Sequence, residues 1–197
     1  MSHVARRTTH VQPSLVVVTA PSGAGKTTIA HRLLAAIPTL RFSVSATTRS
    51  PRAHEHDGVD YHFVTSEDFQ VLIREEALLE WEEVYPGRFY GTPHAELTRV
   101  PEGGALLLDV DVKGALHLKK MFGAQALTLF IAPPSLTALE ARLRARGTET
   151  EKTLAVRLAR ARDELSYADH FDHIVVNEQL ETAVAETLAL VRTFLGA

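Results

Sequence analysis

The residues with the clearest chemical meaning in this 197-residue sequence lie at positions 15–28, LVVVTAPSGAGKTT. An apolar run is followed by a glycine-containing turn and then by Lys-Thr-Thr. This order predicts a buried strand at 15–18, a turn, and a helix that begins near Thr27. Such a turn points backbone N–H groups at an anion, and the helix dipole adds to the attraction. The stretch is therefore predicted to bind phosphate.

Lys26 and Thr27 give this turn the chemistry of a nucleotide site. The lysine is expected to reach the outer phosphates of ATP, and the threonine hydroxyl to bind the accompanying Mg²⁺. Ala20 stands where the pattern G-x-x-x-x-G-K-[ST] begins with glycine, a mild departure that a negative φ would accommodate. The residues predicted to bind ATP here are Pro21, Ser22, Gly23, Ala24, Gly25, Lys26, Thr27 and Thr28.

Six arginines between positions 142 and 162 surround Gly147. Arg142 and Arg146 are four residues apart and share one face of a helix. With Arg157 they predict a lid over a polyphosphate, because a guanidinium group binds phosphate oxygens in pairs and stays charged. The alternative is a solvated helical face, which is the interpretation favoured for Arg144 and Arg162.

A second anion pocket is predicted around Arg49 and Arg52, which follow a strand and lie near Tyr61, Tyr90 and Glu80 in the sequence. The alternative is that the tyrosines are ordinary core residues. If the pocket holds a phosphate acceptor, no side-chain base is needed, because the acceptor brings its own nucleophilic oxygen.

The composition gives little support for other kinds of catalytic or binding site. There are ten histidines but no HxxxH pair, which argues against zinc and a histidine base, and the absence of cysteine excludes thiolate catalysis. The net charge of −3 provides no global attraction to nucleic acid or to a membrane. Residues 1–14 are expected to be a polar tail without a signal-peptide core, and the protein is expected to be cytoplasmic. The oligomeric state is not predicted.

The elements that must position these residues follow an α/β pattern. Apolar strands are predicted at 105–111, 126–131 and 173–177, separated by helices, which indicates a parallel sheet with helices on both faces. Ligands of such sheets lie beyond the carboxyl ends of the strands. The phosphate-binding turn, Asp109 and Asn177 should meet there, and Asp111 shares a strand face with Asp109.

Residues 42–92 differ from this pattern and resemble an inserted antiparallel β lobe, with a strand predicted from Phe42 to beyond Ala46. The expected organisation is a single domain at 15–197. Its core comprises residues 15–41 and 93–197, its lobe about 42–92 and its helical lid about 140–165. A capping box at Thr148 and Glu151 is expected to start the second lid helix.

Together these motifs resemble those of guanylate kinase. The resemblance is carried by PSGAGKTT, FSVSATTRSPR, GVDYHFV, LLEWEEV, YGTP, LLLDVDVKGA, IAPPS, RLRARGTETE and IVVN, in order over about 15–195. It implies an enzyme that converts ATP and GMP to ADP and GDP with Mg²⁺. The loop would carry ATP, the β lobe GMP, and an arginine-bearing lid would close over both.

The resemblance also implies roles for individual residues. Arg49, Arg52, Tyr61 and Tyr90 would hold the phosphate of GMP. Ser45, Glu80, Thr92 and Asp111 would read its guanine. Asp109 would hold Mg²⁺ partly through water, and Asn177 would contact adenine. The residues expected to act in catalysis are Lys26, Arg49, Arg142, Arg146 and Arg157.

Two alternative functions stay open at this point. One is a protein-interaction module that keeps the fold without catalysis, although such modules typically lose the lysine or the arginines that this chain retains. The other is a kinase for a different phosphorylated acceptor, which the carboxylates of Glu80 and Asp111 argue against.

Overall fold

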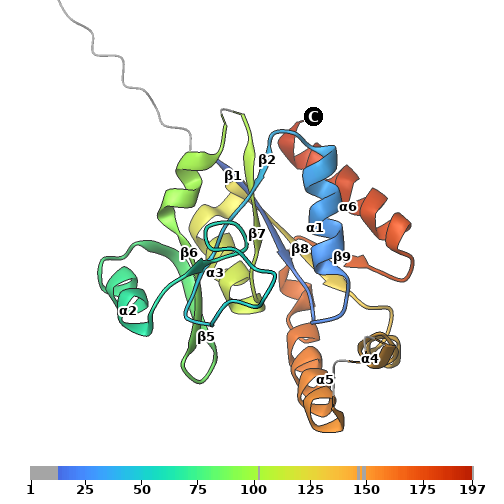
Figure 1. Ribbon diagram of the computed structural model, residues 1–197. Helices are drawn as coiled ribbons and strands as arrows, with labels where there is room; N and C mark the ends of the chain where they lie inside the picture. The colour runs from blue at the N-terminus through green and yellow to red at the C-terminus, as the bar shows by residue number, and fades with distance from the viewer. Residues whose placement is uncertain (1–12, 102, 146, 148–149, 197) are drawn as a thin grey trace, which may run out of the picture.

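The computed structural model describes residues 13–101, 103–145, 147 and 150–196 and contains two β-sheets (Figure 1). The larger sheet has five parallel strands in the order β2-β7-β1-β8-β9. Its strands are β1 (Ser14–Thr19), β2 (Leu40–Phe42), β7 (Ala105–Asp109), β8 (Ala126–Ala132) and β9 (His173–Val176). The predicted parallel sheet is confirmed.

The central strands of this sheet are apolar on both faces, so both faces must be covered. Helices α1 (Lys26–Ala36) and α6 (Leu180–Leu195) lie side by side over one face, where Leu33 and Val191 are fully buried (Figure 1). Helix α3 (Val112–Phe122) covers the other face. The predicted arrangement of helices on both faces is therefore confirmed.

The second sheet has the strand order β4-β3-β6-β5. Its elements are β3 (Ala46–Thr47), β4 (His62–Phe63), β5 (Leu78–Tyr85) and β6 (Arg88–Pro93). Helix α2 (Ser66–Arg74) packs against it, with the ring of Phe69 5.5 Å from that of Phe89. The sheet is antiparallel except for the pair β3–β4, which is parallel. The expected small lobe is present with this one difference in pairing.

The prediction of a single strand from Phe42 to beyond Ala46 is wrong. The chain leaves the larger sheet after Phe42 and enters the second sheet at Ala46. Between them, the backbone N–H of Val44 donates to the Glu96 carboxylate at 2.9 Å. Apolar and polar residues alternate in both segments, because this alternation depends on which side chains are buried and not on which strand is the partner. The sequence pattern therefore does not show where the chain changes sheets.

Helices α4 (Leu136–Ala145) and α5 (Glu151–Leu165) pack on each other through Leu139, Leu143 and Leu154. The capping box of α5 is formed by Thr150 and Thr153, not by the predicted pair. Thr148 lies outside the described residues, and Glu151 is the first residue of the helix. The Thr153 hydroxyl accepts from the N-cap backbone, so a hydroxyl replaces the carboxylate that the sequence pattern suggests.

The remaining described elements are short 3₁₀ helices at His94–Arg99, Gly123–Gln125 and Ala168–His170. Within the described residues, no helix combines the length and apolar character that a membrane span requires.

The fold depends strongly on packing around β8. We expect Leu129→Ala to lower the free energy of unfolding by about 2–5 kcal/mol, because Leu129 is fully buried and its truncation leaves a cavity. Val156→Ala is the control, since Val156 is 57% exposed and should cost well under about 1 kcal/mol. Urea unfolding of both variants tests this. Equal effects would contradict the assignment of β8 to the core.

Candidate active site

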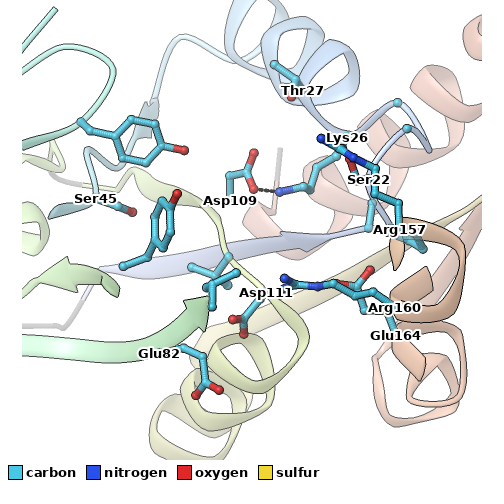
Figure 2. A pocket seen from close by; sticks show the side chains of 18 of the residues that line it. Ser22, Lys26, Thr27, Ser45, Glu82, Asp109, Asp111, Arg157, Arg160 and Glu164 are labelled. Atoms are coloured by element: carbon cyan, nitrogen blue, oxygen red, sulfur yellow. Dashed lines mark hydrogen bonds and ion pairs between the residues drawn. The ribbon is translucent and has the colours of Figure 1, made fainter. Parts of the chain in front are cut away.

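A cavity of about 420 Å³ opens at the carboxyl ends of the parallel strands, between the phosphate-binding turn, the second sheet and α5 (Figure 2). We call it the central cavity. It is lined by Ala20, Pro21, Ser22, Gly23, Gly25, Lys26, Thr27, Thr28, Ser45, Tyr61, Glu80, Glu82, Val84, Tyr90, Gly91, Asp109, Val110, Asp111, Arg157, Arg160 and Glu164.

The turn after β1 is held in a conformation that requires glycine. Gly25 has a φ of 100°, and a Cβ there would lie 2.3 Å from Nδ2 of Asn177. That amide donates to the carbonyl of Ala24 at 2.7 Å. Gly25 is also the N-cap of α1 and brings no side-chain cap. The start of α1, whose first N–H groups have no side-chain cap, therefore lies at the cavity wall, where an anion could accept from them.

Lys26 and Asp109 form an ion pair inside the cavity (Figure 2). Burial lowers the pKa of Lys26 to about 8, and the charges of Glu164 and Asp111 oppose this shift. The lysine therefore stays mainly protonated at neutral pH, which keeps a cation available for a phosphate.

The two residues proposed to hold Mg²⁺ both line the central cavity. Thr27 supplies a hydroxyl and Asp109 a carboxylate, the hard oxygen donors that Mg²⁺ prefers. In the described part of the chain no group of three or more acidic or histidine side chains could hold a metal by itself. Mg²⁺ bound with a nucleotide needs only one or two protein ligands, because phosphates and water complete its shell. The donor set fits such an ion.

Glu80 lies at the opposite side of the cavity and is only 8% exposed. Its Oε1 accepts a 2.6 Å hydrogen bond from the Thr92 hydroxyl. Burial, with a smaller contribution from Asp111, raises the pKa of Glu80 to about 7. A Cβ on Gly114 would lie 2.7 Å from its Oε2, so glycine leaves the room that this carboxylate occupies.

Asp111 combines two positions. Its Oδ1 accepts from the backbone N–H of Gly114 at 2.9 Å and so caps α3, while the residue also lines the cavity. The capping bond fixes the carboxylate at the cavity wall near Glu80.

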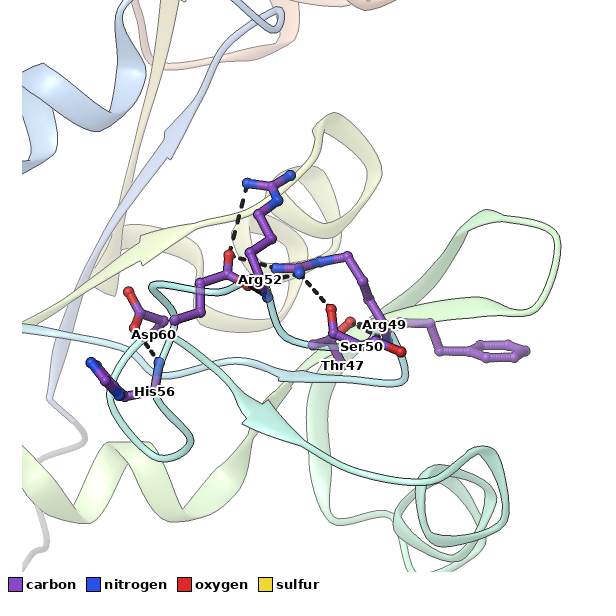
Figure 3. A network of polar contacts seen from close by, with 8 residues as sticks. Thr47, Arg49, Ser50, Arg52, His56 and Asp60 are labelled. Carbon is purple, nitrogen blue, oxygen red and sulfur yellow. Dashed lines mark hydrogen bonds and ion pairs between the residues drawn. The ribbon is translucent and has the colours of Figure 1, made fainter. Parts of the chain in front are cut away.

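Arg49 and Arg52 meet at Glu55, beside the cavity (Figure 3). Arg49 donates from both terminal nitrogens to the Glu55 carboxylate at 2.8 and 2.9 Å. The Arg49 guanidinium also lies 5.2 Å from the centre of the Tyr61 ring. The hydrogen bond from Arg49 lowers the pKa of Glu55 to about 2 and raises that of Arg49. Arg49 is thus held beside a tyrosine that does line the cavity.

The two predicted lid arginines that the structure describes, Arg142 and Arg157, have separate contacts. Arg157 donates to the Ser22 hydroxyl at 2.6 Å and lines the cavity over the phosphate-binding turn. Arg142 donates to the backbone carbonyl of Asn177 at 2.8 Å and is not among the lining residues. Arg146 lies outside the described residues.

The structure thus brings most of the predicted site residues to one cavity. Other predicted site residues are not among its lining residues, namely Ala24, Arg49, Arg52, Thr92, Arg142 and Asn177. The side chains that sequence reasoning missed are Glu82, Arg160 and Glu164. The spacing of Arg157, Arg160 and Glu164, three and four residues apart, is the helical signal that could have found the last two.

A protein-family model described as guanylate kinase matches residues 12–193. This chain belongs to the guanylate kinase family. A guanylate kinase of Salinibacter ruber is 55% identical over 184 residues, which is 93% of this chain and 98% of that protein. One from Chlorobium luteolum is 49% identical and covers 92% of both chains.

A solved structure supports the same family assignment. The crystal structure of guanylate kinase from Anaplasma phagocytophilum has a TM-score of 0.74 and 32% identity. It covers 92% of this chain and 85% of its own. The resemblance inferred from the sequence motifs and the expected fold class are therefore confirmed.

The buried Glu80 carboxyl predicts how stability depends on pH. Its pKa is raised from 4.5 to about 7, so the folded protein binds this proton more tightly than the unfolded chain does. This contribution to stability is complete below about pH 4.5 and is lost as the pH rises through 7. Glu80→Gln cannot ionise, so its free energy of unfolding relative to wild type should rise by up to about 3 kcal/mol between pH 4.5 and 8.

Urea unfolding at both pH values, without nucleotide, measures this difference. Glu186→Gln on the exposed face of α6 is the control and should show no such rise. A constant difference between Glu80→Gln and wild type across this range would contradict the raised pKa.

Proposed function

We propose that this chain transfers the γ-phosphoryl group of ATP to GMP and yields ADP and GDP. The observation that carries the proposal is that one cavity joins a phosphate-binding turn with Lys26 to a pocket with a buried carboxylate, Glu80. The family assignment supports the same reaction.

ATP is assigned to the phosphate-binding turn. Its phosphates would accept from backbone N–H groups at the start of α1, from Lys26 and from Arg157, which already contacts Ser22. Asn177 is assigned to the adenine side, although its side chain also fixes Ala24. When bound, Mg²⁺ would neutralise phosphate charge, held by Thr27 and by Asp109, partly through water.

GMP is assigned to the side of the cavity formed by the second sheet. The ionised Glu80 carboxylate and Asp111 are suited to accept from guanine N1–H and the 2-amino group, and Ser45 or Thr92 to donate to O6. Adenine lacks these donors and would leave buried acceptors unpaired, which gives strong discrimination. Burial of Glu80 makes this penalty large.

Arg49 and Arg52 are assigned to the phosphate of GMP, with Tyr61 and Tyr90. The contact of both arginines with Glu55 supports this role, because it holds two cations near those phenols before any ligand arrives. Pre-ordered guanidinium groups lose less freedom when they bind phosphate.

The transfer itself requires no side-chain base. A phosphate oxygen of GMP forms a bond to the γ-phosphorus as the bond to the bridging oxygen of ADP breaks, and ADP keeps that electron pair. Lys26 and Arg157 would stabilise the charge on the moving group, as would Arg142 and Arg146 if the lid brings them in. Closure of the lobe and lid would exclude water and so prevent hydrolysis.

We further propose that the enzyme acts in the cytoplasm on these small molecules alone, without nucleic acid. The assigned domain limits, with a lobe at about 42–92 and a lid at about 140–165, are part of the same proposal.

A panel of acceptors tests the substrate. With ATP and Mg²⁺, we expect GMP to give kcat/KM values at least about 10³-fold above those for AMP, dTMP and a sugar phosphate, because only guanine pairs with the buried carboxylate. ADP formation is followed in a coupled assay at equal acceptor concentrations. Similar rates for all acceptors would contradict the guanine assignment, and no ADP with any acceptor would contradict a kinase.

Lys26 tests the donor site. Lys26→Ala should lower kcat by at least about 10²-fold, because a desolvated cation next to the transferred group is removed. Lys152→Ala, an exposed residue in the first turn of α5, is the control and should retain wild-type rates. Retained activity in Lys26→Ala would show that ATP binds elsewhere.

A further inference from the structure

Helix α5 turns three charged side chains toward the central cavity. Arg157, Arg160 and Glu164 lie on one face of the helix, and all three line the cavity (Figure 2). Arg162, between them in sequence, is exposed to solvent. Of these three residues on the cavity face of α5, only Arg157 has a role in the proposed mechanism so far. Arg160 and Glu164 have none.

Arg160 is anchored by Glu164. Its Nε donates to Glu164 Oε1 at 2.8 Å, and the two side chains are 36% and 15% exposed. Burial raises the pKa of Glu164, and the charge of Arg160 opposes this shift. A carboxylate that binds Nε fixes the plane of the guanidinium group, whose N–H donors point in set directions from that plane.

The charge balance of the cavity gives this pair a function. Acidic side chains outnumber basic ones among the lining residues: Glu80, Glu82, Asp109, Asp111 and Glu164 face Lys26, Arg157 and Arg160. A phosphate that enters this cavity would be repelled by Glu164 unless a cation offsets that charge. Arg160 is the cation that directly contacts Glu164.

Arg160 differs from Arg157 in where it points. Arg157 contacts Ser22, on the phosphate-binding turn. Arg160 extends from the next turn of α5 toward Asp111, which lies at the cavity wall near Glu80 (Figure 2). Arg160 thus stands between the side assigned to ATP and the side assigned to GMP.

We propose that Arg160 is a catalytic residue that contacts the phosphoryl group during its transfer, and that Glu164 is the positioning residue that orients it. This inference rests on the proposed guanylate kinase activity and adds two residues to it. An arginine placed between donor and acceptor stabilises charge that develops in the transition state more than charge in either bound substrate.

Steady-state kinetics of purified variants with ATP and GMP test this. Arg160→Ala should lower kcat at least about tenfold while each KM changes less than about threefold. Arg160→Lys should recover part of the loss, because it restores a charge without the planar fork. Arg162→Ala, from the exposed side of the same helix, should keep the wild-type kcat.

Glu164→Gln tests the positioning role. It should lower kcat less than Arg160→Ala does, and adding it to Arg160→Ala should restore part of the lost rate, because the unpaired carboxylate is then removed. Thermal unfolding midpoints of all variants show whether each is folded. If the pair of Arg160 and Glu164 only stabilises the helix, the double variant should show no rescue of kcat.

The outcomes separate the two levels of the proposal. An inactive wild-type protein would overturn the proposed function itself. An active wild type with unchanged kcat in Arg160→Ala, or with an equal loss in Arg162→Ala, would overturn only the role of Arg160. A change confined to one KM would also overturn it, since that would place Arg160 at a single bound substrate.

Discussion

The site depends on the close approach between the phosphate-binding turn and the end of β9. Gly25 can adopt its φ of 100° and leave room for the Asn177 amide only because it has no Cβ. That amide holds the carbonyl of Ala24, and the backbone carbonyl of Asn177 in turn accepts from Arg142 of α4. The turn, the edge strand and the base of the lid are thereby joined through one buried residue.

A second constraint is the concentration of charge in a partly desolvated cavity. Several charges there have a nearby partner of opposite sign: Lys26 has Asp109, Arg160 has Glu164, and Arg49, beside the cavity, has Glu55. Such pairs cost less than isolated buried charges would, and they keep the side chains oriented without ligand. Glu80 differs from these residues, with a hydroxyl partner and a raised pKa. Its carboxylate gains a full set of donors only from a ligand, which links its burial to recognition of a base that donates hydrogen bonds.

The sequence was sufficient to predict elements that are adjacent along the chain. It was insufficient to predict contacts between residues far apart in the sequence. Residues 15–28 predicted their own strand, turn and helix because the three elements are adjacent. The break between Phe42 and Ala46 was missed because the change of sheet is decided by β7 and β6, far along the chain. Arg142 was assigned to a lid from helical spacing, whereas its contact with the Asn177 carbonyl depends on how α4 meets β9. Glu164 lies four residues after Arg160, so helical spacing could have placed both on one face, but a carboxylate in an arginine-rich helix does not by itself indicate a phosphate site.

The two connections between the sheets meet at a single buried carboxylate, Glu96. The chain passes from the larger sheet to the second through residues 43–45 and returns after Pro93 through the helix His94–Arg99. Glu96 lies in the return segment, accepts from the N–H of Val44 in the outgoing one at 2.9 Å, and also accepts from Arg99 at 3.0 Å. Both connections are therefore tied at one point. Lys26 begins α1, which follows β1 of the larger sheet, and Glu80 lies in β5 of the second sheet. The tie at Glu96 therefore joins the two parts of the fold that carry the two sides of the proposed site.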